Sequence, residues 1–401
     1  MNATTSTSPE VLRARMVDHV VHAGHARSGP VEEAMRTVPR HEFVPGAPLE
    51  DAYGNQAVIT KSAADGAALS CASLPLVVGM MLDQLGVTPG DHVLEFGAGT
   101  GYNAALLAYL TGPDGQVTTI DIDPEVTAQA RQALDATGYG HVRVITRDGV
   151  LGAAERAPYD RLIATVGVWD IPPAWWEQMT SGGRLVLPLR WRGQTRSVAL
   201  VREGDRLVSD SVELCGFVPM VGQEGERTGH IAPDGQVTLY WDADQAVSVD
   251  VLDGVLEQPK EAVWAGVTVG GGESFDGIWL RLTGIEPGTC RLAAEAAAID
   301  SDLCFPVIAS RSPALVEGGS LAYLSRRRDE NSSPGRWELG AIGHGPAGAE
   351  LADRLGEQIL MWNSDRNAEP VITVYPAGTP DDQLLGGMAI NKQHVRLVVS
   401  Y

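Results

Sequence analysis

The fold is decided by the stretch Val93-Leu94-Glu95-Phe96-Gly97-Ala98-Gly99-Thr100-Gly101-Tyr102-Asn103. Its first four residues are apolar except for one acid, and they predict a buried parallel strand. Three glycines follow at two-residue spacing, and the apolar residues 104–110 predict a helix. Strand, glycine turn and helix form the first half of a dinucleotide-type βαβ unit. Glycine suits such a turn because the backbone bends sharply and approaches a ligand closely. The sequence therefore predicts a Rossmann-like α/β domain.

The spacing of the glycines and the acid ahead of them indicate the ligand. A nicotinamide fingerprint reads G-x-G-x-x-G, whereas this loop reads E-x-G-x-G-x-G. A pyrophosphate gains little from a neighbouring carboxylate, but a cationic sulfonium with an amino-acid tail can use one. We therefore expect S-adenosyl-L-methionine as the cofactor rather than NAD. The alternative is a tight turn without a ligand, because a lone glycine motif is a weak signal. The expected cofactor-binding residues of the loop are Glu95, Gly97, Gly99, Gly101 and Tyr102.

Two further acids follow the next predicted strands. Asp121 ends a strand about 20 residues after the glycine loop, where such folds place a carboxylate on ribose hydroxyls. Asp148, followed by Gly149, ends the next strand. It either accepts a hydrogen bond from an adenine amino group or is a turn aspartate, and both readings stay open. Asp123, just before a proline, is predicted to be a helix N-cap instead. Glu95, Asp121 and Asp148 together predict a cofactor crevice at one edge of the sheet.

The composition restricts the partners of the protein. The chain has 401 residues, enough for two domains, with 44% hydrophobic and 20% charged residues. A net charge of −21 argues against nucleic acid, because phosphate binding needs a basic surface. An acidic peptide would need a local basic patch. One candidate patch, which can also be a solvated hairpin, consists of Arg184, Arg190, Arg192 and Arg196.

Neither metal nor membrane is expected. The four cysteines are scattered without C-x-x-C spacing, so no zinc site or disulfide framework is indicated. His19, His22 and His25 lie three residues apart and drift around a predicted helix without accompanying carboxylates, so a ligand role is not expected. No apolar run reaches membrane-spanning length, and the polar N-terminus lacks a signal-peptide core. We therefore expect a cytoplasmic protein with reduced thiols.

Motifs outside the glycine loop agree with one protein family. Residues 33–45 read EAMRTVPRHEFVP and resemble the N-terminal signature of protein-L-isoaspartate O-methyltransferases. The resemblance covers residues 10–215, about half of the chain, and it implies an S-adenosylmethionine-dependent enzyme that methylates a peptide carboxylate. The later motifs that agree in order and spacing are Ser73-Leu74-Pro75, the 93–103 loop, Asp121, Arg147-Asp148-Gly149, Tyr159-Asp160-Arg161-Leu162-Ile163 and Gly182-Gly183-Arg184-Leu185-Val186-Leu187-Pro188.

The resemblance implies which residues are catalytic. In that family a serine lies beside the transferred methyl group and holds the substrate carboxylate, and the matching residue is Ser73, with Ser70 as a second candidate. Ser73 can also be the N-cap of the helix that follows it. The family usually has the run G-Q-T-I-S, whereas this chain reads Leu69-Ser70-Cys71-Ala72-Ser73. This change in the loop leaves the specificity for the substrate open.

Three tryptophans follow the predicted strand 160–164. Ligands of such folds bind at this end of the strands, so the aromatic rings can form a wall for a peptide. The alternative for Trp175 and Trp176 is packing under the sheet. Trp169 is the expected substrate-binding residue of the three.

The second half of the chain predicts a different kind of domain. We place the boundary between a methyltransferase domain, residues 1–222, and a C-terminal α+β domain, residues 223–401. Residues 349–361 predict an amphipathic helix. Short alternating runs predict strands at 236–241, 246–252, 277–282, 290–294, 303–308, 320–324, 371–375 and 395–399.

A basic cluster in this half is a candidate peptide-binding patch. Arg326 and Arg327, with a third arginine after them, can hold an acidic peptide through charge-assisted hydrogen bonds, or they can be a solvated turn. The whole chain resembles an actinobacterial subgroup that accompanies ribosomally made peptides such as lanthipeptides. The resemblance implies that the C-terminal domain recognises a precursor peptide.

Three functions remain as hypotheses. The first is esterification of an aspartate in a modified, cyclised ribosomal precursor peptide, which leads through a succinimide (aspartimide) to isoaspartate. The second is general repair of isoaspartate in damaged proteins. The third is a precursor-binding protein with an inactive methyltransferase half, which the intact glycine loop argues against. The sequence does not indicate the oligomeric state.

Overall fold

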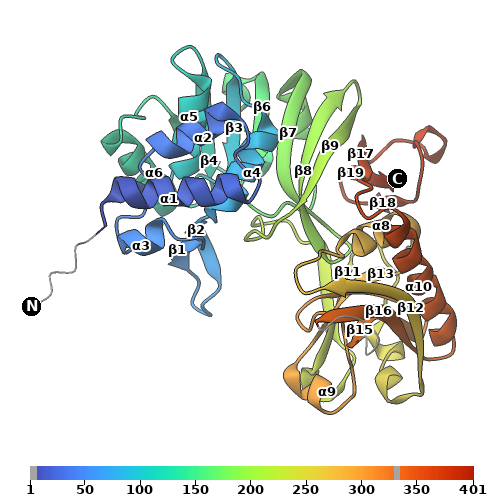
Figure 1. The fold of residues 1–401 in the computed structure, drawn as a ribbon. Coiled ribbons are helices and arrows are strands. Elements are labelled where there is room, and N and C mark those ends of the chain that lie inside the picture. Colours follow the sequence, from blue (N-terminus) through green and yellow to red (C-terminus); the bar gives the residue numbers. More distant parts are fainter. Residues whose placement is uncertain (1–6, 329–334) are drawn as a thin grey trace, which may run out of the picture. The chain divides into compact units, whose positions relative to one another are not determined.

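The computed structural model describes residues 7–328 and 335–401, and the chain divides into two compact units (Figure 1). Unit 1 contains the residues up to Leu189 and Thr195–Gln223, and unit 2 contains Arg190–Gln194 and Glu224–Tyr401. The break after Gln223 lies one residue from the boundary placed between residues 222 and 223. The sequence did not predict that a short part of a hairpin, Arg190–Gln194, belongs to unit 2.

Unit 1 is an α/β domain, and its elements alternate in the order expected for βαβ units. Its helices are α1 Pro9–His22, α2 Gly29–Thr37, α3 Leu49–Ala52, α4 Pro75–Leu85, α5 Tyr102–Thr111, α6 Pro124–Ala136 and α7 Pro173–Glu177. Its strands are β1 Val58–Ser62, β2 Ala68–Ala72, β3 His92–Phe96, β4 Gln116–Asp121, β5 Arg143–Thr146, β6 Tyr159–Ala164, β7 Met179–Trp191, β8 Gln194–Glu203 and β9 Arg206–Leu214.

The main sheet of unit 1 brings the predicted cofactor residues to one edge. Its strand order is β9-β8-β7-β6-β3-β4-β5, with β7 to β5 parallel and β9 antiparallel to β8. Phe96 at the end of β3 pairs with Ile120 of β4 and with Ala164 of β6. The carboxyl ends of neighbouring parallel strands therefore meet, and the glycine loop lies beside Asp121.

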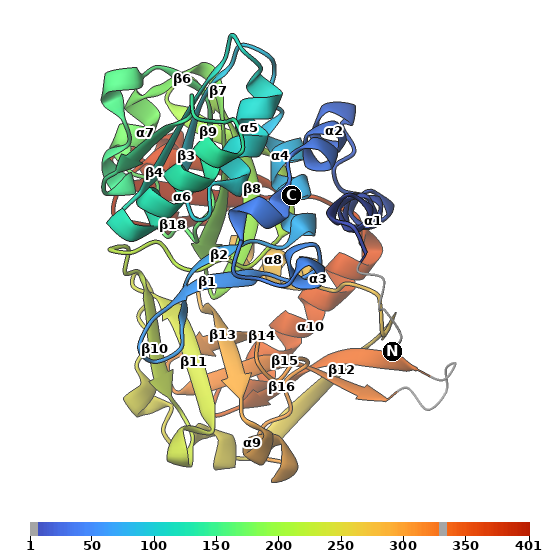
Figure 2. The same cartoon turned by 90° about the vertical axis from the view of Figure 1, so that its left-hand side faces the viewer.

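A separate hairpin completes unit 1. Strands β1 and β2 pair with each other and not with the main sheet, and Figure 2 shows them as a two-stranded ribbon. Lys61 on β1 donates to Asp123 and Glu125 at the start of α6, each at 2.7 Å. Asp123 accepts from the backbone N–H of Glu125 at 2.9 Å, so the predicted N-cap is confirmed. The sequence did not predict this hairpin.

Unit 2 is strand-rich, and with unit 1 it confirms the predicted fold class, an α/β domain with a C-terminal α+β domain. The antiparallel sheet has the order β10-β11-β13-β14-β15-β16-β12, and β17, β19 and β18 form further antiparallel pairs. The elements are β10 Glu226–His230, β11 Val237–Asp242, β12 Lys260–Gly270, α8 Gly277–Ile285, β13 Thr289–Ala294, α9 Ala296–Asp300, β14 Ser312–Glu317, β15 Ser320–Arg328, β16 Arg336–His344, α10 Gly348–Ser364, β17 Val371–Pro376, β18 Ala389–Asn391 and β19 Val395–Ser400.

Three of the predicted strands of unit 2 are wrong. Residues 277–282 belong to helix α8, residues 246–252 contain only a short 3-10 turn, and residues 303–308 form no strand. A short apolar run does not distinguish a buried helix from a buried strand. Ile278 and Leu282 of α8 are fully buried against Leu351 and Leu355 of α10, which decides for the helix.

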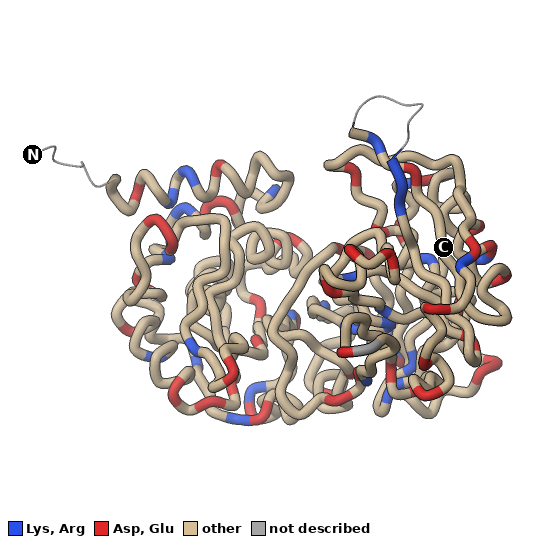
Figure 3. The backbone as a smooth tube through the Cα atoms, turned by 90° about the horizontal axis from the view of Figure 1, so that it is seen from below, with Lys and Arg blue, Asp and Glu red and all other residues tan. Residues whose placement is uncertain are grey.

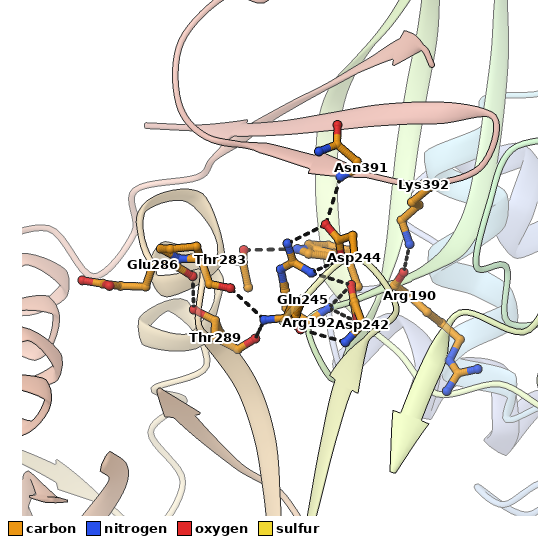
Figure 4. Close-up of polar contacts among 12 residues, drawn as sticks. Arg190, Arg192, Asp242, Asp244, Gln245, Thr283, Glu286, Thr289, Asn391 and Lys392 are labelled. Atoms are coloured by element: carbon orange, nitrogen blue, oxygen red, sulfur yellow. Dashed lines mark hydrogen bonds and ion pairs between the residues drawn. The ribbon is translucent and has the colours of Figure 1, made fainter. Parts of the chain in front are cut away.

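Ion pairs and hydrogen bonds of Arg192 attach the hairpin tip, residues 190–194, to the rest of unit 2. Figure 4 shows Arg192 beside Asp242 and Asp244. Its guanidinium donates to both Asp244 oxygens at 2.5 and 2.9 Å, and its backbone N–H donates to Asp242 at 3.0 Å. Burial raises the pKa of Asp242 to about 6, opposed by the nearby Lys392 and Arg192. The sequence suggested that Arg192 belongs either to an acid-binding patch or to a solvated hairpin. Both predictions are wrong for Arg192, because it is 3% exposed and paired within the chain.

Candidate active site

A cavity of about 310 Å³ lies at the carboxyl edge of the parallel strands of unit 1. The β1–β2 hairpin with the segment that follows it forms one wall, the glycine loop forms the floor, and residues 216–218 contribute a third side. Most of the predicted catalytic and cofactor residues meet here, although they come from three separate parts of the chain. The predicted residues that line the cavity are Ser70, Ser73, Glu95, Gly97, Gly99, Tyr102 and Asp121.

The glycine loop keeps side chains out of the cavity floor. Gly97, Gly99 and Gly101 have φ angles of +96°, +48° and +86°, which are in the left-handed region that favours glycine. A Cβ added at Gly97 would lie 2.7 Å from Thr165 Oγ1. The Gly97 N–H also donates to the carbonyl of Ile120 at 2.8 Å, which fixes the loop on the end of β4. A ligand can therefore lie directly on the backbone.

Glu95 is a buried acid with one oxygen unused. Its side chain is 0% exposed, and Oε1 accepts from Asn103 Nδ2 at 2.8 Å. Oε2 has no hydrogen-bond partner among the residues that the structure describes. Burial raises the pKa of Glu95 to about 7, and the nearby polar side chains of Thr119 and Asn103 oppose the rise. A cationic donor from a ligand would satisfy Oε2 and favour the ionised form.

Asp121 lies one strand further along the same edge. Its Oδ2 accepts from the N–H of Gly99 at 3.2 Å, and its Oδ1 accepts from the N–H of Asp123 at 3.1 Å. Burial raises the pKa of Asp121, and these backbone donors oppose the rise. The carboxylate is thus oriented by the glycine loop and lines the cavity, where ribose hydroxyls can reach it.

Ser73 lies in the segment between β2 and α4. The N-cap of α4 is Leu74, and no side chain caps this helix, so the capping role predicted for Ser73 is wrong. The carbonyl of Ser73 accepts from Arg40 Nη2 at 2.8 Å. The Ser73 side chain also hydrogen-bonds the Cys71 thiol, and burial raises the pKa of that thiol. Ser73 lines the cavity, and Arg40 holds the backbone of its segment.

Ser70 lies on strand β2, close to the glycine loop. It is 9% exposed, and its hydroxyl accepts from Thr60 Oγ1 at 3.2 Å. A Cβ added at Gly99 would lie 4.0 Å from Ser70 Oγ. The hairpin thus covers the loop on this side, and Ser70 faces the cofactor floor.

Three predicted cofactor residues do not line the cavity. Gly101 has a packing role, because an added Cβ would lie 3.2 Å from the carbonyl of Ala130. Asp148 is exposed and accepts from the N–H of Val150 at 3.0 Å, which is the contact of a turn aspartate. A Cβ added at Gly149 would lie 3.0 Å from a methionine side chain. The adenine role of Asp148 and Gly149 stays a prediction.

The tryptophans divide between packing and the cavity surroundings. Trp175 is fully buried, stacks on Phe96 at 3.9 Å between ring centroids and donates to the carbonyl of Gly149 at 2.9 Å. Its packing role is therefore confirmed. Trp169 is 8% exposed, and its backbone N–H donates to Gln223 Oε1 at 2.6 Å. Trp169 does not line the cavity. Its role in substrate binding stays a prediction.

The two predicted peptide-binding arginines are exposed near the end of β15 in unit 2. Figure 3 colours the lysine and arginine positions of the backbone blue and the acidic positions red. The Arg326 guanidinium lies 4.5 Å from the ring centroid of Trp337, and that of Arg327 lies 4.4 Å from the ring centroid of Trp264. Arg327 also pairs with Glu338 at 2.7 Å. Aromatic rings under the guanidinium planes hold them extended on the strand surface. These contacts are not those of a freely solvated turn.

Sequence reasoning missed Arg40 and Asn103 as residues of the site. Arg40 lies in the motif of residues 33–45 and Asn103 in that of residues 93–103, but neither spacing nor charge indicated that Arg40 is fully buried or that Asn103 binds Glu95. Among residues 7–328 and 335–401, no three potential metal ligands come together. No helix of the described ranges is long and apolar enough to cross a membrane.

A glycine turn that excludes side chains, with a buried acid ahead of it and a second acid one strand away, suits a nucleoside cofactor with a cationic tail. The fold and the cavity thus define the class of Rossmann-like methyltransferases. The family model of protein-L-isoaspartate(D-aspartate) O-methyltransferase matches residues 12–225, more than half of the chain, and the chain belongs to this family. It is therefore a protein carboxyl O-methyltransferase, and its methyl donor is S-adenosyl-L-methionine.

Curated relatives carry the same family name. The protein-L-isoaspartate O-methyltransferase of Methanopyrus kandleri is 38% identical over 215 residues, which are 53% of this chain and 92% of that protein. That of Koribacter versatilis is 37% identical over 213 residues, again 53% of this chain and 92% of that protein. These relatives are matched over nearly their whole length, while about half of this chain has no counterpart in them.

Two solved structures are similar at low identity. One, a protein-L-isoaspartate O-methyltransferase, has a TM-score of 0.49 and 18% identity and covers 90% of this chain and 96% of its own. The other is from Plasmodium falciparum, described as a putative enzyme of this family in complex with S-adenosyl-L-homocysteine. It has a TM-score of 0.47 and 13% identity and covers 54% of this chain and 100% of its own.

Proposed function

We propose that this methyltransferase esterifies a normal aspartate in a modified, cyclised ribosomal precursor peptide, which leads to a succinimide and then to isoaspartate. The observation that carries the proposal is the second unit. The family match ends at residue 225. The matched half of this chain accounts for 92% of the length of each of the two curated relatives. An enzyme that repairs any exposed isoaspartate needs no further domain, whereas an enzyme that selects one peptide has a use for one.

The altered substrate loop supports the same proposal. The family run G-Q-T-I-S is replaced by Leu69-Ser70-Cys71-Ala72-Ser73, and all five residues line the cavity. Only the final serine is kept. Leu69 is 49% exposed and places an apolar side chain at the cavity where the family has a glycine. A changed cavity wall with an unchanged serine fits the same reaction on a different peptide.

The reaction makes few demands on acid–base chemistry. An aspartate side chain has an ordinary pKa of about 3.9, so its carboxylate is already an anion at neutral pH. No general base is needed to activate the nucleophile. The protein therefore has to align the carboxylate oxygen with the methyl group and exclude water from it.

We propose a task for each residue of the cavity. S-adenosyl-L-methionine, when bound, supplies a methyl group on a sulfonium as the electrophile. Glu95 binds the ammonium of the amino-acid tail, Asp121 binds ribose hydroxyls, and the glycine loop lets the cofactor lie on the backbone. Ser73 donates a hydrogen bond to one carboxylate oxygen and so orients the other toward the methyl group. After transfer, the next backbone nitrogen of the peptide attacks the ester and expels methanol, which forms the succinimide.

Unit 2 supplies a surface suited to an acidic peptide segment. Arg326 and Arg327 are exposed, lie over tryptophan rings and belong to a chain with a net charge of −21. A local basic patch attracts acidic segments, whereas the rest of this acidic chain repels them. We therefore propose that these arginines bind acidic residues of the precursor.

A second candidate function is general repair of isoaspartyl residues in proteins. The names of the curated relatives favour it, because they are protein-L-isoaspartate O-methyltransferases. The same cavity and the same Ser73 would serve this reaction, with the carboxylate displaced by one methylene group. The two functions differ in the substrate and in the role of unit 2.

An intact-mass assay distinguishes them. The full chain and S-adenosylmethionine are incubated with the cyclised precursor peptide encoded beside its gene, or with a synthetic isoaspartyl peptide. Gain of one methyl group followed by net loss of water, on the precursor alone, is the expected result. Methylation of the isoaspartyl peptide alone would establish repair instead. No mass change on either peptide, despite cofactor binding, would contradict both functions.

A further inference from the structure

Arg40 is a fully buried arginine directly behind the substrate wall of the cavity. It opens a 3-10 helix of residues Arg40–Phe43 and is 0% exposed. Its Nε donates to the carbonyl of Ala52 at 2.8 Å, and its Nη2 donates to the carbonyls of Ala72 and Ser73 at 3.2 and 2.8 Å. One guanidinium thus joins the end of α3, the end of β2 and the segment that carries Ser73.

The charge of Arg40 is not balanced by an acid. Its hydrogen-bond partners among the described residues are backbone carbonyls, no carboxylate is among the charges that act on it, and its Nη1 has no hydrogen-bond partner there. Burial lowers the pKa of Arg40, and Tyr102, Cys71 and Tyr53 oppose the fall. An unpaired buried cation is costly to a fold, so a role that needs positive charge at this place would explain it.

Arg40 also contacts the cofactor side of the cavity. Its guanidinium carbon lies 5.1 Å from the ring centroid of Tyr102, which lines the cavity just after the glycine loop. The Tyr102 hydroxyl is buried and also lacks a partner among the described residues. Arg40 therefore connects the segment that orients the substrate with the helix that begins at the cofactor loop.

We propose that Arg40 is a positioning residue with two separable effects. Its forked hydrogen bonds hold the Ser73 segment against the cofactor loop, which aligns the carboxylate with the methyl group. Its uncompensated positive charge, close behind the cavity wall, attracts the substrate carboxylate, because charges interact strongly in a low-dielectric interior. The methyl ester is neutral and is attracted less, so the same charge favours release of the product.

The two effects fall on different kinetic constants. Lysine keeps the charge but loses the fork, so R40K should lower kcat about tenfold and change KM for the peptide by less than about twofold. Glutamine also loses the charge, so R40Q should in addition raise KM about tenfold or more. The affinity for S-adenosylhomocysteine should stay within about twofold of the wild type in both variants, since Arg40 does not line the cavity.

The experiment measures methyl transfer by the full chain to whichever peptide, the cyclised precursor or the isoaspartyl peptide, is methylated in the intact-mass assay. A matched control is R36Q, because Arg36 lies on the neighbouring helix α2 but is paired with Asp18 and Glu32. It should leave kcat and KM unchanged. This inference rests on the proposed function. A wild type that methylates neither the precursor nor the isoaspartyl peptide would contradict that function, whereas an active wild type whose kcat and KM are unchanged in R40K and R40Q would contradict only the role of Arg40.

Stability measurements show whether a loss of activity in R40K or R40Q comes from unfolding of the variant. Each variant is compared with the wild type by thermal unfolding and by S-adenosylhomocysteine titration. An equal loss of kcat in R40K and R40Q without any change in KM would overturn the electrostatic part. Failure of both variants to fold would also overturn the proposal, because it would assign Arg40 to folding alone.

Discussion

Three arginines of the described residues are buried almost completely, and two of them, Arg40 in unit 1 and Arg192 in unit 2, differ in what surrounds the charge. Arg192 in unit 2 is 3% exposed and lies between Asp242 and Asp244, with a bidentate pair to the second. Arg40 in unit 1 is 0% exposed and contacts only backbone carbonyls and an aromatic ring. The paired arginine holds a hairpin tip in its domain. Arg40, which has no such acidic partner, lies behind the cavity in which an anionic substrate is expected. We therefore interpret the absence of a paired acid at Arg40 as an indication of a functional role.

The largest effect is expected from Arg192→Met. The substitution removes Arg192 from the buried Asp242 and from Asp244 and leaves Lys392 as a cation near Asp242, which should lower the free energy of unfolding by about 3 kcal/mol. Chemical denaturation of the full chain measures it. The control is Arg366→Met, because the Arg366–Glu273 pair is solvent-exposed and should matter little. An unchanged unfolding curve for Arg192→Met would contradict the comparison, since Arg192 would then be no more important to the fold than a surface arginine.

Ser73→Ala is expected to have the next largest effect. Loss of the hydroxyl that orients the carboxylate should lower kcat roughly 10–100-fold, with unchanged affinity for S-adenosylhomocysteine. Steady-state methylation of the peptide that the wild type methylates in the intact-mass assay measures the first, and calorimetric titration measures the second. Ser70→Ala is the matched control, because Ser70 lines the same cavity but lies on strand β2 next to the glycine loop and not in the segment between β2 and α4. A larger loss of kcat in Ser70→Ala than in Ser73→Ala would contradict the prediction, because Ser70 would then be the serine that orients the carboxylate.

A third prediction concerns Glu95 and pH. Burial raises the pKa of Glu95 from 4.5 to about 7, so its contribution to stability is fully present below about pH 4.5 and is lost as pH rises through 7. Cofactor binding has the opposite dependence, because the ammonium needs the ionised carboxylate. The affinity for S-adenosylmethionine should therefore rise up to about tenfold between pH 6 and 8. Glu95→Gln should weaken binding at pH 8 and remove this dependence; a parallel dependence in wild type and variant would count against the assignment.

The smallest effect is expected at a cation that is both paired and exposed. Lys61 joins the β1–β2 hairpin to Asp123 and Glu125, and its amine and the carboxylates keep contact with solvent. Water screens such pairs. Lys61→Met should therefore leave the thermal midpoint close to that of the wild type, while hydrogen exchange in β1 and β2 becomes faster. A large fall in the midpoint would mean that exposure is a poor guide to the energy of these ion pairs.

The sequence predicted the part of the site that depends on local structure. Glu95, Gly97, Gly99 and Asp121 were found because a strand, a turn and the next strand define their positions within about thirty residues. The hairpin that brings Ser70 and Ser73 over the glycine loop could not be predicted from the spacing of residues, although the family resemblance indicated Ser73.

Arg40 and Arg192 show what the sequence could not provide. Arg40 gains its environment from Ala52, Ala72 and Ser73, which become neighbours only in the folded chain. Arg192 lies in a stretch that suggested an exposed basic hairpin, and its two carboxylates follow about fifty residues later. Burial of a charge is decided by tertiary contacts, and charge patterns alone carry no information about it.

The most direct test of the account is a crystal structure of the full chain with S-adenosylhomocysteine. The account predicts that the amino group of the ligand lies within about 3.2 Å of Glu95 Oε2, that Asp121 contacts the ribose hydroxyls, and that the ligand sulfur faces Ser73. A ligand whose amino group points away from Glu95, or whose sulfur lies on the side of the cavity opposite Ser73, would contradict it.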